Sequence, residues 1–246
     1  MNDDYKVKSV LGDPGRSTFR KYRDIVYGDT SLTHVIVCEC IELLFSWLPG
    51  ALGLALRQVF YPLFFKSVGT KVIFGKGLTI RHGRKIAIGD GVVLDDHAVI
   101  DAKGESNKGI TIEDGVYIGR NTIVYCKNGN IHIERSVNIS SNCQVFSSNA
   151  LTIGRQTVIG AFTYILSGGE YDYTDKLHTF AEQSGMNTKG PLSIGPNCWI
   201  SAGVVVVDAA NIGEHCVIGA GAVVTKPIPA HSLAVGVPAR VVQSIA

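Results

Sequence analysis

Aliphatic residues recur every six positions through most of the chain. The repeat is clearest over residues 194–224, where units such as IGPNCW, IGEHCV and IGAGAV each begin with an aliphatic residue. A period of six differs from the 3.6 of a helix and the 2.0 of a strand. A short fixed repeat with an apolar first residue is typical of a parallel β-helix, in which each unit is one short strand and a turn. The pattern therefore predicts an all-β solenoid.

The same period extends back to residue 74, with small additions before Ile88, Ile133 and Ile153 and one unit (106–111) without its first apolar residue. The predicted first inward residues are Phe74, Ile80, Ile88, Leu94, Ile100, Ile112, Ile118, Val124, Ile133, Ile139, Val145, Ile153, Ile159, Ile165, Ile194, Ile200, Val206, Ile212 and Ile218. The residue four places later is small or β-branched, except at Asn149, as a narrow interior corner requires: Val92, Ala98, Val116, Thr122, Val137, Cys143, Thr157, Thr163, Cys198, Val204, Ala210, Cys216 and Ala222. Stacked coils would bury both positions. With three units per turn, Cys198 and Cys216 should stack.

The repeat resembles that of the hexapeptide-repeat acyltransferases, whose coils wind as a left-handed parallel β-helix. The closing stretch IGAGAVVTKPIPAHSLAVGVPARVV (218–242) is similar to the end of their acetyl-CoA-dependent sugar O-acetyltransferase branch, and the similarity covers about 71–242. The left hand comes from this resemblance alone, because the general rule for parallel crossovers gives the opposite hand. The resemblance also implies a homotrimer with a site at each subunit interface.

The sequence divides into three parts: an N-terminal arm and apolar helical segment (1–70), the β-helix (71–226) with an inserted loop at 167–193, and a C-terminal extension (227–246). Residues 1–30 are polar and predict a loose arm with one short helix. The apolar segment 31–66 predicts a helix with Ser31 as N-cap and an end at Pro49-Gly50, then a second helix over about 51–65.

The apolar segment has two interpretations. Its longest charge-free run, 43–56, contains Pro-Gly and is shorter than the roughly 20 residues that a bilayer-spanning helix needs. The helices would either cover the open end of the solenoid or lie in a membrane interface. The resemblance favours membrane contact, because related O-acetyltransferases of surface-polysaccharide assembly carry a similar apolar leader. The residues expected to enter lipid are Phe45, Trp47, Phe60, Tyr61, Phe64 and Phe65.

Composition narrows the class of protein. The net charge is +2, without a Lys/Arg-rich run, so we expect no nucleic-acid partner. Six cysteines without a C-x-x-C pair predict buried, reduced thiols in a cytoplasmic protein. If the apolar segment 31–66 lies in a membrane interface, we expect that contact at the inner face of the membrane. No signal peptide is expected. The histidines show no metal-ligand spacing: His97, His215 and His82 are expected at outward corner positions, and His132 in an insertion at a corner. No metal is expected.

Acetyl transfer to a hydroxyl group needs a slot for the pantetheine arm and donors for the oxyanion. The resemblance places acetyl-CoA, as co-substrate, along a groove between subunits. Ala202, Gly203, Ala220 and Gly221 match the small residues that let the arm approach, although turn geometry alone also explains them. Thr225, Lys226 and Arg240 match residues near the nucleotide, where a basic side chain pairs with phosphate.

The reaction also needs a base. Inserted loops in repeat proteins gather on the working face, and the resembling enzymes carry a histidine base in this loop. Here that segment reads GGEYDY (168–173), so Tyr171 or Asp172 holds the histidine's place. Asp172 is the base if burial raises its pKa, or His178, in the same loop, supplies an imidazole. The third alternative is that no base remains.

The sequence therefore predicts an acetyl-CoA-dependent O-acyltransferase that acts on a sugar hydroxyl of a surface polysaccharide or its lipid-linked precursor. One alternative is a non-catalytic trimeric scaffold or CoA-binding pseudo-enzyme. The other is an aminosugar N-acetyltransferase, because a neutral amine depends less on a strong base. The sequence identifies neither the acceptor nor the acyl-chain length.

Overall fold

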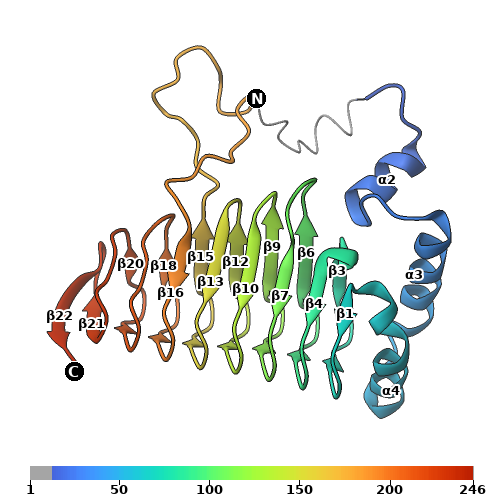
Figure 1. The fold of residues 1–246 in the computed structure, drawn as a ribbon, viewed down its shortest axis with the longest axis horizontal. Coiled ribbons are helices and arrows are strands. Elements are labelled where there is room, and N and C mark those ends of the chain that lie inside the picture. Colours follow the sequence, from blue (N-terminus) through green and yellow to red (C-terminus); the bar gives the residue numbers. More distant parts are fainter. Residues whose placement is uncertain (1–12, 246) are drawn as a thin grey trace.

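The structure is a computed structural model that describes residues 13–245. A group of helices at one end leads into a long parallel β-helix of about eight turns (Figure 1). The helices are α2 (Thr18–Val26), α3 (Leu32–Phe45) and α4 (Gly50–Phe60), followed by the 3-10 helix η1 (Tyr61–Phe64). The predicted N-cap is confirmed, since the Ser31 side chain accepts from the backbone N–H of His34. The predicted second helix ends as α4 at Phe60, and η1 follows it, with Pro62 in the first turn of η1.

Three sheets form the sides of the solenoid. Sheet A contains β1 (Ser67–Val68), β4 (Ile86–Ile88), β7 (Ile110–Ile112), β10 (Asn130–Ile133), β13 (Ala150–Ile153) and β16 (Leu192–Ile194). Sheet B contains β2 (Ile73–Phe74), β5 (Val93–Leu94), β8 (Tyr117–Ile118), β11 (Asn138–Ile139), β14 (Val158–Ile159), β17 (Trp199–Ile200), β19 (Val217–Ile218), β21 (Ser232–Val235) and β22 (Arg240–Ser244). Sheet C contains β3 (Thr79–Arg81), β6 (Val99–Lys103), β9 (Ile123–Lys127), β12 (Gln144–Ser147), β15 (Tyr164–Ser167), β18 (Val205–Val206) and β20 (Val223–Val224). A second 3-10 helix, η2 (Gly83–Lys85), precedes β4.

Among the strands of residues 13–245, each pairs in parallel with the strand one coil away, except that β21 and β22 pair antiparallel. The chain is a left-handed parallel β-helix, as the sequence predicts. Pairing begins at Ser67 and continues through β21, slightly outside the predicted bounds of 71 and 226. The C-terminal extension forms β21 and β22.

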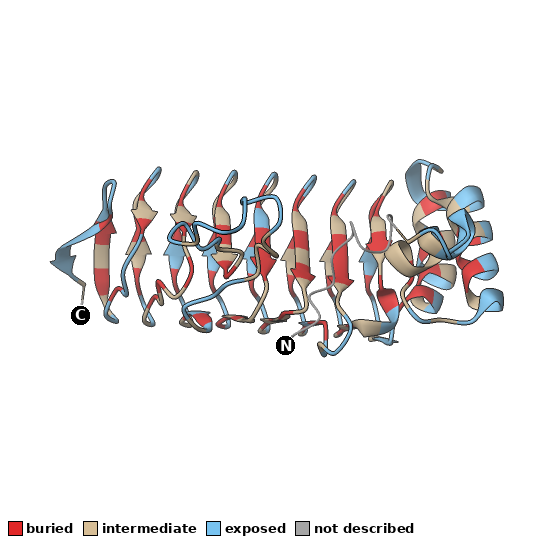
Figure 2. Cartoon of the chain, turned by 90° about the horizontal axis from the view of Figure 1, so that it is seen from above, coloured by how far each residue is buried: buried red, intermediate tan, exposed pale blue. Residues whose placement is uncertain are grey.

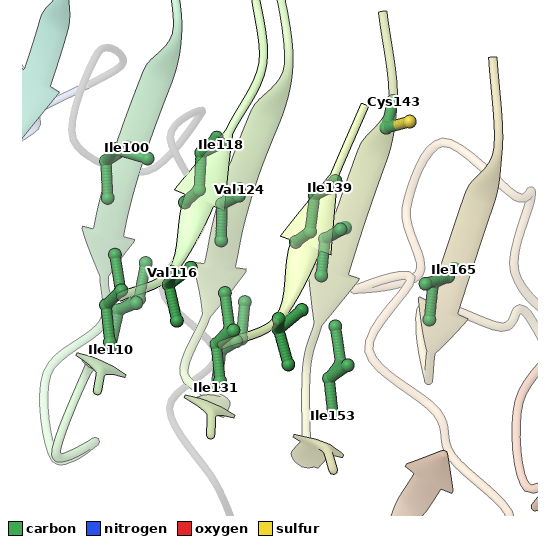
Figure 3. Packing of buried hydrophobic residues seen from close by; sticks show 14 of the residues in the cluster. Ile100, Ile110, Val116, Ile118, Val124, Ile131, Ile139, Cys143, Ile153 and Ile165 are labelled. Atoms are coloured by element: carbon green, nitrogen blue, oxygen red, sulfur yellow. The ribbon is translucent and has the colours of Figure 1, made fainter. Parts of the chain in front are cut away.

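Ladders of identical or similar side chains fill the interior. Ile118, Ile139 and Ile159 pair in register on successive coils and are fully buried. Figure 3 shows how such residues converge inside the solenoid. Every predicted inward residue of both series is buried. Burial of each large aliphatic side chain stabilises the fold by about 1.5–3 kcal/mol, so the repeat alone accounts for a continuous core.

The cysteine prediction is confirmed in part. Cys198 and Cys216 are buried one coil apart, because Trp199 pairs with Val217. The six thiols are free, and five of them are buried. Cys40 is exposed on α3, so the expectation of buried thiols is wrong there.

The corners use left-handed backbone. Between sheets B and C, one residue of each coil has positive φ, including Asn142 (59°), Gly203 (68°) and Gly221 (68°). Glycine and asparagine adopt this conformation at low cost. Phe162 occupies the same corner with φ 62° and is 70% exposed. A bulky residue there costs about 1–2 kcal/mol.

Two histidines differ from expectation. His82 is only 3% exposed, and its Nδ1 lies 3.0 Å from Asp101 Oδ1. It is buried because the end of α2 covers this corner, where the His82 N–H donates to the Val26 carbonyl. His132 lies within β10, with Nε2 2.7 Å from Glu113 Oε1, because the added residues extend the strand.

The helices cover the open N-terminal end of the solenoid, as the first of the two interpretations predicts (Figure 2). Tyr61, Phe64 and Phe65 are buried beside Phe74, so their predicted contact with lipid is wrong. They follow α4 where the chain turns into the first coil. Phe45 and Phe60 stack on each other half-buried, whereas Trp47 is exposed. None of the helices in 13–245 has the length and apolarity to cross a bilayer.

Candidate functional site

The long loop 168–190 leaves sheet C after β15 and re-enters sheet A at β16, projecting from one edge of the solenoid (Figure 1). Asp208 holds both ends of this loop. Its carboxylate is 4% exposed and accepts from the backbone N–H groups of Gly168 and Lys189, each at 2.5 Å, and from the Thr188 hydroxyl at 3.3 Å. A buried carboxylate is tolerated only with such partners. Asp208 therefore fixes the base of the loop.

Sequence reasoning missed Asp208, although a signal was present. The second residue after the inward aliphatic of sheet C is also buried, and on four successive coils it is small and uncharged: Ala102, Cys126, Ser147 and Ser167. Asp208 holds the same place after Val206. A charged residue at a position that is otherwise small, uncharged and buried needs a specific hydrogen-bond partner. For Asp208, that partner is the loop.

Further contacts join the two ends of the loop, residues 168–170 and 187–189, which we call its neck. The Lys189 ammonium lies 2.7 Å from Glu170 Oε1, and Glu170 forms a β-bridge with Asn187. The Gly169 N–H donates to Ser148 Oγ at 2.9 Å. Gly168 has φ 85°, and a Cβ there would lie 2.1 Å from Ser148 Oγ, so a larger residue would strain the backbone and displace the Ser148 side chain. The neck is thus fixed to the coils.

Replacement of Asp208 by alanine is expected to release this loop. Removing the carboxylate leaves buried N–H groups unpaired, at about 1–3 kcal/mol, so local opening should rise roughly tenfold to a hundredfold. Limited trypsin digestion, followed at the exposed Lys176, measures this opening. Ser167→Ala, in the same inward column, should leave the cleavage rate unchanged. Equal rates for wild type and Asp208→Ala would contradict the clamp.

Asp172 lies exposed in a turn of the loop. Its Oδ1 accepts from the Thr174 hydroxyl at 2.6 Å and from the Thr174 N–H at 2.8 Å. These hydrogen bonds hold the pKa of Asp172 below its ordinary value. The condition under which Asp172 would act as the base, burial that raises its pKa, is therefore not met, because the turn exposes the carboxylate and stabilises its charge. Tyr171 packs edge-on against Phe180, with ring centroids 6.0 Å apart.

His178 forms a pair with Asp175 in the same loop. Its Nδ1 lies 2.9 Å from Asp175 Oδ2. Asp175 Oδ1 accepts from the Leu177 N–H at 2.8 Å; this bond, with that from His178, lowers the pKa of Asp175 and keeps it ionised. A carboxylate facing Nδ1 fixes the imidazole tautomer and leaves Nε2 as the proton acceptor. Asp175 is a second residue that sequence reasoning missed.

Ala202, Gly203, Ala220 and Gly221 lie at the corner between sheets B and C. The Gly221 N–H donates to the Ala202 carbonyl at 3.0 Å, so the two small pairs stack on adjacent coils. We call these four residues the small-residue corner. It lies at the opposite edge of sheet C from the loop, so one chain does not bring the two together.

The three remaining predicted residues are exposed near the C-terminal coils. Thr225 and Lys226 directly follow β20, at the edge of sheet C from which the loop also leaves. Arg240 begins β22, next to Ala239, whose N–H donates to the Val223 carbonyl at 2.8 Å. Within residues 13–245, no three His, Cys, Asp or Glu side chains gather as a metal site would require.

The family model described as bacterial transferase hexapeptide (six repeats) matches residues 191–226. A putative acetyltransferase of Staphylococcus aureus (strain Mu50) is 40% identical over 116 residues, which cover 47% of this chain and 56% of the relative. Residues 191–226 thus carry the hexapeptide repeat of the bacterial transferases. The galactoside O-acetyltransferase of Escherichia coli (strain K12) is 32% identical over 123 residues, or 50% of this chain and 58% of that protein. The chain thus spans about half the length of the curated relatives it matches.

Among solved structures, AntD, an N-acyltransferase from Bacillus cereus in complex with dTDP and 3-hydroxybutyryl-CoA, superposes with a TM-score of 0.55. The alignment covers 82% of this chain and 92% of AntD at 20% identity, so the two proteins share the fold. The family match at 191–226 contains the small-residue corner, Thr225 and Lys226. Loop 168–190 and the N-terminal helices lie outside this match.

Proposed function

We propose that the protein transfers an acetyl group from acetyl-CoA to a sugar hydroxyl of a surface polysaccharide or its lipid-linked precursor. The hexapeptide-repeat match at 191–226 and the acetyltransferase names of the relatives support the reaction class. The observation that carries the proposal is the Asp175–His178 pair, 2.9 Å apart, on a loop that Asp208 clamps to the coils. Six free thiols fit a reducing compartment. We propose that the reaction takes place in the cytoplasm.

His178 is the proposed base. Its Nε2 takes the proton of the acceptor hydroxyl as that oxygen attacks the thioester carbonyl carbon. A C–O bond forms, and backbone N–H groups at the coil corner stabilise the resulting oxyanion. The oxyanion then collapses and the C–S bond breaks. The CoA thiolate leaves and receives the proton from the imidazolium, so the protein returns to its starting state.

The positions of the remaining candidate residues suggest where acetyl-CoA binds and how the subunits assemble. The small-residue corner presents no side chain larger than a methyl group and would admit the pantetheine arm. Thr225, Lys226 and Arg240 are assigned to the nucleotide end, where the cations would pair with phosphates. Because loop and corner lie at opposite edges of sheet C, we propose a homotrimer in which the loop of one chain meets the corner of its neighbour.

CoA release from acetyl-CoA, measured with a panel of neutral sugars and amino sugars, tests this function. We expect turnover with hydroxyl acceptors. Turnover with amino sugars alone would identify an N-acetyltransferase. If the full chain binds CoA but turns over no acceptor, the scaffold alternative replaces the enzyme. Sedimentation equilibrium tests the trimer separately, and a monomer would contradict the shared site.

The pH profile distinguishes the two candidate bases. A base acts in its unprotonated form, so kcat/KM for an imidazole base should rise with pH across the near-neutral range. Asp172 has a lowered pKa, so it is ionised throughout this range and would give a flat profile. We expect the rising profile. A flat profile in the wild type would exclude His178 as the base.

A further inference from the structure

The helical segment 31–65 turns its charged side chains inward. Arg57 is 3% exposed, and its guanidinium donates to the carbonyls of Phe74 at 2.9 Å, Leu48 at 2.8 Å and Phe45 at 3.2 Å. Glu39 accepts from the hydroxyls of Tyr22 and Tyr27 on the α2 side. The two other ionisable side chains that can carry charge near neutral pH, His34 and Glu42, are half-buried. No charged side chain of this segment is exposed.

Its outward side is apolar instead. The residues we call the apolar end face are each at least 44% exposed: Leu32, Ile36, Val37, Leu43, Leu44, Trp47, Leu52, Val59 and Leu63. They follow helical spacing along α3 and α4, and Figure 2 shows exposed stripes on these helices at the end of the molecule. A helix of a water-soluble domain places its charged residues outward. Here the arrangement is reversed, and exposed apolar residues gathered on one element of the fold indicate an interaction surface.

The first coil, which follows these helices directly, is rich in basic residues. Residues 66–85, which form the first coil, contain no acidic residue but six cations: Lys66, Lys71, Lys76, Arg81, Arg84 and Lys85. The coil is joined to the helices by hydrogen bonds from Gly77 N–H to the Ser46 carbonyl (2.9 Å) and from Gln58 Nε2 to the Val72 carbonyl (3.1 Å). Within the solenoid, acidic residues first appear in the second coil, beginning with Asp90.

We propose that the helical end docks on the surface of an anionic lipid bilayer. The apolar end face enters the boundary between headgroups and acyl chains, and the exposed Lys66, Lys71 and Arg84 contact anionic headgroups. Apolar surface followed by positive charge along the solenoid axis matches the order of acyl chains and phosphates in a leaflet. Protein interfaces differ, since about four-tenths of their area is polar. The uncharged face therefore favours hydrocarbon over a protein partner.

Flotation of the purified full chain with phosphatidylcholine vesicles, with and without phosphatidylglycerol, tests the docking. Leu43→Asp/Leu44→Asp changes two exposed side chains and should weaken binding by about 100-fold or more. Val241→Asp/Val242→Asp, exposed at the other end of the solenoid, is the matched control and should bind as wild type does. Lys66→Gln/Lys71→Gln/Arg84→Gln should reduce the preference for phosphatidylglycerol on the order of 100-fold. Circular dichroism establishes that each variant is folded.

Fluorescence locates the contact independently. The chain has two tryptophans, so Trp199→Phe leaves Trp47 as the reporter. Its emission should shift to the blue on vesicles and be quenched by brominated lipid. Wild type that stays unbound to both kinds of vesicle would overturn the proposal, as would undiminished binding by Leu43→Asp/Leu44→Asp. Self-association in lipid-free buffer that this double variant abolishes would identify a protein interface instead.

Discussion

Replacement of His178 by alanine should lower kcat by about 10²–10⁴-fold, while the affinity for acetyl-CoA stays unchanged. The variant removes the one imidazole of loop 168–190, which the Asp175 carboxylate orients from 2.9 Å. Measuring kcat and CoA binding separately distinguishes loss of the base from loss of the donor site. Asp175→Asn should cause a smaller loss, since the base remains but its tautomer is no longer fixed.

Two matched variants sharpen this result. His132 also pairs with a carboxylate, that of Glu113 at 2.7 Å, but on sheet A away from the loop. His132→Ala should therefore keep full activity. Asp172→Asn should change kcat little. The hydrogen bonds from Thr174 lower the pKa of Asp172, and a carboxylate with a lowered pKa is a weak base. An inactive Asp172→Asn beside an active His178→Ala would assign the base to Asp172, and two active variants would point to Tyr171 or to the substrate.

Replacement of Arg57 by methionine should lower the free energy of unfolding by about 2–4 kcal/mol. The guanidinium bonds two carbonyls at the end of α3, those of Phe45 and Leu48, and the Phe74 carbonyl of the first coil. Methionine fills similar space but leaves these buried acceptors unpaired, and the last carbonyls of a helix have no internal partner. The loss should therefore fall on the junction between helices and solenoid.

Thermal unfolding measures this effect. A chain of this size should lose roughly 2–4 °C in Tm for each kcal/mol, so Arg57→Met should melt about 4–16 °C below wild type. Gln58→Met is the control, since Gln58 is exposed and makes one hydrogen bond to the first coil, from Nε2 to the Val72 carbonyl. It should cost about 1 kcal/mol or less. Equal melting temperatures for the two variants would show that the buried guanidinium adds no stability of its own.

The sequence by itself determined the solenoid and its interior. A six-residue period with three units per turn leaves each aliphatic residue one direction to point, so Ile118, Ile139 and Cys143 could be placed in the core from spacing alone. The N-cap at Ser31 was readable for a similar reason, because it depends on residues within one turn of the chain. The broken repeat also marked the loop that carries His178.

The tertiary structure decided the environment of residues outside the repeat. His82 is buried because α2, far away in sequence, covers its corner. Tyr61 packs into the solenoid end, although its sequence context suits lipid equally well. The low pKa of Asp172 and the clamp by Asp208 depend on how the loop turns and returns. Spacing fixes which way a side chain points, but its solvation and charge depend on which distant segment packs over it.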